Sequence, residues 1–254
     1  MRKIISSVIS AILLTSLVSG VVAKESKTSY EVTFQAEEIN DLSTLFIRAK
    51  NNITDYKSTP SAEAKLQTDG GVEKNLKVYH TTQRLKTERN IATSEQKESY
   101  VTYYFYGIPK EVLDNKSISI LGSTSDEDWD SSYSVKAYST YYWDKYKSTN
   151  GDGFKKLTKV TGGWTISDNK VSITSREVRY GASGGALRDD GTHGGSVIQD
   201  SGPLYPSSNS FSYDAPKNWK PVSDWASTIG VNTKATLKLG TETWTLKLDN
   251  YKTN

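Results

Sequence analysis

The chain has 254 residues, with 32 Lys and Arg against 29 Asp and Glu, two His and no Cys. Without cysteine, a disulfide framework, a cysteine nucleophile and a thiolate metal site are excluded, and two histidines are too few for an ordinary His-rich zinc site. A net charge of +3 is too small to indicate nucleic-acid binding, so we expect no nucleic-acid partner.

The N-terminus has the three-part pattern of a secretory signal. A short basic segment, Met1-Arg2-Lys3, precedes an apolar run from Ile4 to Val18, and Val21-Val22-Ala23 offers small residues for cleavage after Ala23. We therefore predict that residues 1–23 are a signal peptide and that the protein is secreted. No second apolar run follows, so we expect no transmembrane segment in the mature chain. A secreted protein without cysteine is typical of a Gram-positive bacterium.

Residues 24–99 form a polar region with few aromatic residues. Alternation over 30–36 predicts a strand, and apolar residues at helical spacing predict a short amphipathic helix over 37–50. Residues 51–73 are polar and contain Pro and Gly, so we predict a loop or flexible linker. Residues 84–99 are highly charged, which indicates a solvated helix or a disordered stretch.

Residues 100–254 form an aromatic-rich region that contains all six tryptophans. The glycine-rich residues 181–195 and the proline-rich residues 203–221 are predicted to be loops. The C-terminal alternation, with a turn at Gly240-Thr241, predicts a β-hairpin with one apolar face; its inward residues are Ala235, Leu237, Leu239, Trp244, Leu246 and Leu248. We predict a mainly β protein, whose C-terminal part is an antiparallel sandwich or barrel, with a short helix near the N-terminus.

A glycine-flanked serine is the strongest hint of catalysis. Gly181-Ala182-Ser183-Gly184-Gly185 resembles the nucleophile turn of trypsin-like serine proteases, and His80 and Asp126 precede Ser183 in the chain order of that family. Ala182 replaces the acidic or amide residue usual before the serine, and His80 is not flanked by small residues. A glycine loop without catalytic function is the competing interpretation.

An acidic cluster is the one candidate for a metal site. Asp126, Asp128 and Asp130 have the first, third and fifth spacing of a calcium loop. Ser131 and Ala137 occupy the positions where an EF-hand needs Gly and Glu, so the cluster is not an EF-hand. A looser calcium site and a solvated loop remain the two alternatives; we otherwise expect no cofactor.

Aromatic residues near acidic turns are candidate sugar platforms, because flat rings pack on pyranose rings. Trp129, Tyr142 and Trp143 are the residues that we predict for ligand binding. The segment 154–179 is locally basic, which fits either anionic cell-wall polymers and lipid headgroups or the exposed face of strands.

Three segments resemble a pattern found in uncharacterised secreted β-rich proteins of Gram-positive bacteria: residues 128–132, 135–140 and 159–164. Thr243-Trp244-Thr245-Leu246 completes the pattern, which covers about residues 126–250. The resemblance implies secretion and a β-rich C-terminal part. It brings no activity and no functional residue.

The leading hypothesis is a secreted, non-enzymatic β-protein that binds an extracellular glycan, cell-wall polymer or protein. It depends on the signal pattern, the aromatic strands and the scarcity of catalytic patterns. The first alternative is a β-pore-forming or bacteriocin-like toxin, since Ser/Thr-rich amphipathic strands suit a closed barrel. The second alternative is a serine hydrolase that uses His80 and Ser183.

Overall fold

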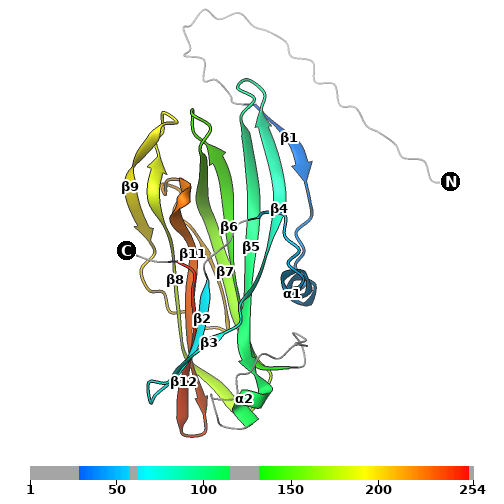
Figure 1. Cartoon of the computed structure of the whole chain (residues 1–254), viewed down its shortest axis with the longest axis vertical. Coiled ribbons are helices and arrows are strands. Elements are labelled where there is room, and N and C mark those ends of the chain that lie inside the picture. Colours follow the sequence, from blue (N-terminus) through cyan, green and yellow to red (C-terminus); the bar gives the residue numbers. More distant parts are fainter. Residues whose placement is uncertain (1–28, 58–61, 115–131, 252–254) are drawn as a thin grey trace, which may run out of the picture.

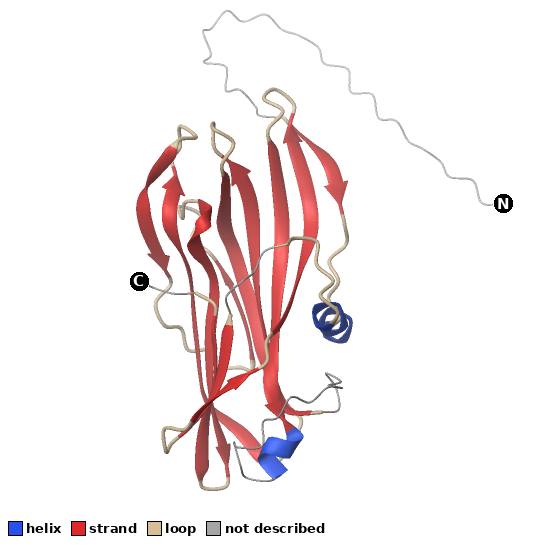
Figure 2. Ribbon diagram, in the orientation of Figure 1, coloured by secondary structure: helices blue, strands red, loops and turns tan. Residues whose placement is uncertain are grey.

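A computed structural model of the chain describes residues 29–57, 62–114 and 132–251. Long antiparallel strands run almost the whole length of the molecule (Figure 1). Three hairpin tips lie at one end of the molecule, and the β11–β12 hairpin and α2 lie at the other end (Figure 1). The prediction of a mainly β, antiparallel protein with a short helix near the N-terminus is confirmed (Figure 2).

The strands and helices of the described residues have the following bounds: β1 (Tyr30–Gln35), α1 (Leu42–Lys50), β2 (Glu63–Thr68), β3 (Glu73–Leu76), β4 (Tyr79–Asn90), β5 (Gln96–Pro109), α2 (Lys110–Asp114), β6 (Tyr133–Lys147), β7 (Gly153–Ile166), β8 (Val171–Leu187), β9 (His193–Asp200), β10 (Ser210–Asp214), β11 (Val222–Leu239) and β12 (Glu242–Asp249).

One sheet contains all twelve of these strands. Its main path runs β1-β4-β5-β6-β7-β11-β12-β2-β3, while β10 adds to β7, and β8 and β9 extend from β11. The path divides into two halves at β7, because β11 pairs with β7 only at Val222 and Ser223. The first half holds β1, β4, β5, β6, β7 and β10, and the second half holds the other six strands.

The two halves share one hydrophobic core. Its buried residues come from β5, β6, β7 and β10 of the first half, from β2, β3, β8, β11 and β12 of the second half, and from α2. A hydrogen bond between the Tyr106 and Thr233 hydroxyls crosses between the halves inside this core. Each half therefore stabilises the other by removing apolar surface from water.

β5 is buried on both faces because a second, smaller cluster covers its other side. Val101, Tyr103 and Phe105 face α1, whereas Tyr104 and Tyr106 face the shared core. This arrangement follows from the strand alternation, which sends successive side chains to opposite faces. Strands from residues 24–99 and from residues 100–254 thus belong to one sheet.

The helix α1 covers part of the first half of the sheet. It begins at Leu42 because the Asp41 carboxylate accepts a hydrogen bond from the Thr44 amide at 2.7 Å, which is an N-cap. Its buried residues Leu45, Phe46 and Ala49 pack on β4 and β5. The helix predicted over 37–50 is confirmed, but it begins at Leu42, five residues later than predicted, because Asp41 is its N-cap.

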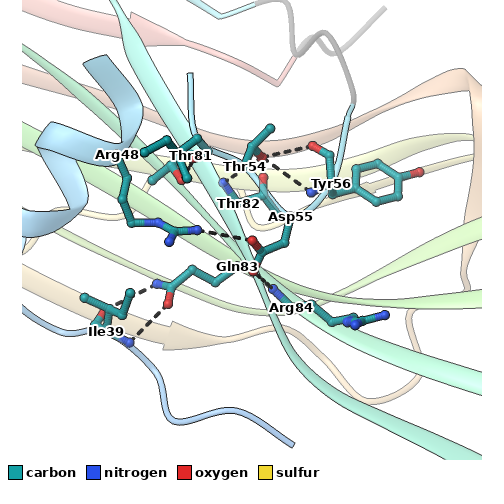
Figure 3. Close-up of polar contacts among 10 residues, drawn as sticks. Ile39, Arg48, Thr54, Asp55, Tyr56, Thr81, Thr82, Gln83 and Arg84 are labelled. Atoms are coloured by element: carbon teal, nitrogen blue, oxygen red, sulfur yellow. Dashed lines mark hydrogen bonds and ion pairs between the residues drawn. The ribbon is translucent and has the colours of Figure 1, made fainter. Parts of the chain in front are cut away.

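A strap follows α1 and covers the edge of β4 where β1 no longer pairs with it (Figure 3). The Asp55 amide donates to Thr82 O at 2.9 Å, and the Asp55 carboxylate accepts from the Arg84 amide at 3.1 Å and from the Arg48 guanidinium at 3.2 Å. Thr54 Oγ1 accepts from the Thr82 amide at 3.2 Å. The strap, residues 53–56, therefore satisfies backbone groups that an open strand edge would leave unpaired.

Two predictions for the N-terminal region are wrong. Residues 84–99 form the ends of β4 and β5 and the turn between them, because their charges pair across strands: Glu98 lies 3.8 Å from Arg84 and 3.7 Å from Lys145. The linker predicted over 51–73 includes β2, whose Ala64 and Leu66 are buried in the shared core. Packing against β12 imposes extended structure on a segment with weak local preference.

Two predicted loops in the C-terminal region also contain strands. The glycine-rich residues 181–195 lie mostly in β8 and β9, where glycine leaves room for the side chains packed on it. β10 lies within the stretch predicted as loop over 203–221 and pairs with β7. The C-terminal hairpin is confirmed as β11–β12, with Gly240 at a positive φ of 62° in the turn. Among the described residues, no helix is long and apolar enough to cross a membrane.

Candidate functional site

Trp225 on β11 is the most exposed tryptophan of the described residues. It is 70% exposed, which is unusual for so large an apolar side chain. The pairing of β11 with β8 is irregular between Val222 and Ser227, so Trp225 lies on a distorted segment outside the regular ladder. The other described tryptophans are buried or packed against the core: Trp143, Trp164, Trp219 and Trp244.

His193, the first residue of β9, supports Trp225 from one side. Its ring centroid lies 6.1 Å from that of Trp225 and 5.3 Å from that of the fully buried Phe154. Gly185 on β8 makes this position available, because a Cβ there would lie 2.5 Å from His193 Cε1. We call Trp225 and His193 the aromatic patch.

The aromatic patch lies on the outer face of β8, which we define as the face that carries Glu177, Arg179, Gly181, Ser183 and Gly185. Side chains two residues apart share a face of a strand. The opposite face carries the buried residues Val178 and Ala182. Ile198 of β9 pairs with Ser183 and is 62% exposed, so it adds an apolar group to the outer face.

The residue before Trp225 is anchored on the inner side. The Asp224 carboxylate packs against Gly153, and its charge acts on the Lys155 amine. Burial lowers the pKa of Lys155, and Asp224 partly opposes that shift. Lys155 Nζ lies 5.0 Å from the Tyr56 ring centroid and 5.1 Å from that of Trp143. The contacts of Asp224 with Gly153 and Lys155 hold the backbone next to Trp225, while the ring of Trp225 stays open to solvent.

The predicted sugar platforms lie elsewhere. Trp143 is buried, stacks on Tyr100 at 4.6 Å and donates its indole N–H to Thr102 Oγ1 at 3.1 Å, so its faces contact protein. Tyr142 is half-buried and donates its hydroxyl to Glu38 at 2.7 Å. Burial is the main cause that raises the pKa of Tyr142, and the hydrogen bond to Glu38 raises it further. The structure brings neither residue to the aromatic patch, and Trp129 lies outside the described residues.

The structure does not bring His80 and Ser183 together. His80 is on β4, where its ring stacks at 6.0 Å on Tyr104 and burial lowers its pKa. Ser183 is on β8 and its hydroxyl lies 2.8 Å from that of Thr228. Four strands, β5, β6, β7 and β11, separate β4 from β8 in the sheet. Asp126 lies outside the described residues.

The predicted calcium ligands cannot be placed, because Asp126, Asp128 and Asp130 all lie outside the described residues. Among the residues that are described, no group of three or more His, Asp or Glu side chains could hold a metal ion.

Comparison with known proteins gives no match to a family model, to a curated protein or to a solved structure.

Sequence reasoning missed both residues of the aromatic patch. Trp225 follows Pro221 closely and is flanked by Asp224 and by the small residues Ala226 and Ser227, so it belongs to no apolar alternation. That isolation was the available signal for an exposed tryptophan. His193 gave no such signal, because its place over Gly185 depends on the pairing of β8 with β9.

Proposed function

We propose that the protein is a non-enzymatic binding protein that recognises a glycan on an extracellular surface through the aromatic patch. The observation that carries the proposal is the exposure of Trp225 beside the supporting ring of His193. A rigid aromatic face of this kind packs on the apolar face of a sugar ring at little cost in conformational entropy.

The separation of His80 from Ser183 favours binding over hydrolysis as the proposed function. A serine nucleophile needs its base within hydrogen-bond reach. Ser183 instead lies beside Thr228, and His80, which stacks on Tyr104, is on β4, a strand that does not pair with β8. A serine-reactive fluorophosphonate probe tests the hydrolase alternative: labelling of Ser183 would support it and would count against the proposal.

The extracellular location is part of the proposal and depends on the signal pattern of residues 1–23. N-terminal sequencing of the protein recovered from culture medium should start at Lys24. Recovery of the chain only from cells, with Met1 intact, would contradict this part.

The binding function is tested with purified protein on a glycan array, isolated peptidoglycan and intact bacterial cells. Trp225→Ala should abolish most binding, because it removes the stacking face without removing a core contact. Tyr205→Ala is a matched control, because Tyr205 is also 70% exposed but lies away from the aromatic patch. The residue before it, Leu204, pairs with Val178, which is seven residues from Gly185 on β8. Equal binding by the wild type and Trp225→Ala would refute the proposed site.

The toxin alternative stays a prediction. Release of dye from liposomes by the purified protein would support it. We expect the Trp225→Ala variant, which should lose glycan binding, to release as much dye as the wild type.

A further inference from the structure

A polar groove lies on the outer face of β8, beyond the aromatic patch. It has a volume of about 180 Å³ and lies among β8, β11 and β12. Three of its lining side chains are basic and two are acidic; the lining residues are Glu177, Arg179, Asn232, Thr233, Lys234, Lys247 and Asp249. Because Arg179 is paired with Asp200 outside this lining, the groove itself holds two further cations, Lys234 and Lys247, beside two carboxylates.

Three lysines lie side by side across this part of the sheet. Lys234 on β11 pairs directly with Lys247 on β12, and Lys247 pairs directly with Lys65 on β2. Neighbouring strands are about 4.8 Å apart, and like charges directly opposite each other destabilise a sheet. The row of Lys65, Lys247 and Lys234, which we call the lysine row, is therefore costly unless anions lie beside it.

Each lysine of the lysine row has one carboxylate partner in the protein. Lys234 lies 3.8 Å from Glu177, Lys247 lies 2.7 Å from Asp249, and Lys65 lies 3.5 Å from Glu73. The side chains of Lys234 and Lys247 are both 47% exposed. Partly exposed ion pairs contribute about 0–1 kcal/mol, so a lysine amine can turn from its carboxylate to a bound anion at little cost.

Arg179 has a different role at the end of the groove. It forms a bidentate pair with Asp200 of β9, and this pair raises the pKa of Arg179 and lowers that of Asp200. The planar pairing holds Arg179 in place. The two lysines that line the groove, Lys234 and Lys247, are thus its adaptable cations.

The groove and the aromatic patch lie on the same face. Arg179 and Gly185 are six residues apart on β8, which is about 20 Å along a strand. The C-terminal residues Asn250 and Tyr251 pack over Gly230 and Gly181 between the two features. An extended ligand that follows β8 and β11 and passes over Asn250 and Tyr251 would contact Trp225 at one end and Lys234 and Lys247 at the other.

We propose that this face binds a linear glycan that carries phosphate groups, with the sugars on the aromatic patch and the phosphates on Lys234, Lys247 and Lys65. This inference rests on the proposed function and names its ligand class. Lysine binds phosphate as a point-charge donor, so the two adaptable lysines of the groove suit a phosphate group. The small net charge of the chain argues against nucleic acid as the source of the phosphates.

The test measures binding to three probes: a sugar-substituted poly(ribitol phosphate), the same polymer without sugars, and a neutral glycan that binds the wild type. The double variant Lys234→Gln/Lys247→Gln should bind the first probe roughly tenfold more weakly at low salt and should reduce the slope of log affinity against log salt by about 1.5. Its binding to the neutral glycan should not change. Trp225→Ala should weaken binding of the first and third probes.

Lys170→Gln/Lys238→Gln is the matched control, because it makes the same change in net charge at two exposed lysines that do not line the groove. This control should bind all three probes as the wild type does. Unchanged affinity and salt slope in the Lys234/Lys247 variant would overturn the inference while the Trp225 result still supports the proposed function. No effect of Trp225→Ala on any probe would overturn the proposed function itself. Single-stranded DNA that competes as strongly as the first probe would overturn the glycan assignment.

Discussion

Replacing Asp55 by Ala tests whether the strap stabilises the open edge of β4. The substitution removes the acceptor for the Arg84 amide, at 3.1 Å, and the ion pair with Arg48, at 3.2 Å. The Asp55 amide keeps its bond to Thr82 O in either case, because that bond is made by the backbone. The change is thus limited to two side-chain interactions.

The expected loss of stability is about 1–2 kcal/mol. An unpaired backbone N–H costs about 1–3 kcal/mol when fully buried, and the Arg84 amide lies at a partly exposed edge, so we take the lower end of that range. The Arg48–Asp55 pair adds at most about 0.5 kcal/mol, because the Asp55 side chain is 44% exposed.

Asp55→Asn separates the two contributions. Its amide oxygen can still accept from the Arg84 N–H, whereas the ion pair is lost, so we expect a loss of about 0.5 kcal/mol or less. The assay is urea unfolding followed by tryptophan fluorescence, with amide hydrogen exchange at Thr82 and Arg84 as a local measure. Asp55→Ala should speed exchange at the Arg84 amide more than Asp55→Asn does.

Equal unfolding midpoints for the wild type and Asp55→Ala would refute the reasoning that the strap satisfies the edge. A loss in Asp55→Asn as large as that in Asp55→Ala would show that the ion pair, and not the backbone acceptor, dominates.

Three further predictions follow from the packing. Gly181→Ala should destabilise the protein by about 1–3 kcal/mol in a thermal melt, since its Cβ would collide with the Tyr251 ring, while Gly195→Ala has open space and should change the melting temperature little. Trp143→Ala should cost about 3–5 kcal/mol because its buried ring leaves a cavity, whereas Trp225→Ala should stay within about 0.5 kcal/mol of the wild type in urea unfolding. Burial raises the pKa of Tyr251 to about 12. The Tyr251 hydroxyl therefore contributes fully to the free energy of unfolding below pH ~10, where the unfolded chain also keeps the proton, and this contribution falls between pH ~10 and 12. The urea midpoint of Tyr251→Phe should therefore fall less than that of the wild type from pH 9 to pH 11, and an equal fall in both would contradict that pKa.

The sequence alone determined the parts of the fold whose pattern is local. The alternation of Ala235, Leu237, Trp244, Leu246 and Leu248 predicted the C-terminal hairpin, because a strand buried on one face needs an apolar residue at every second position. The amphipathic spacing before residue 50 likewise predicted α1, and only its first residue depended on the Asp41 cap.

Only the tertiary structure decided the long-range pairings and, with them, the site. Residues 181–195 looked like a loop because glycine has weak strand propensity, yet Gly181 and Gly185 are in β8, where the rings of Tyr251 and His193 occupy the space above them. The exposure of Trp225 and its contact with His193 join residues that are distant in the chain. The lysine row joins β2, β11 and β12 in the same way, through cross-strand register. Register between distant strands is fixed by the packing of the whole sheet, which no local pattern encodes.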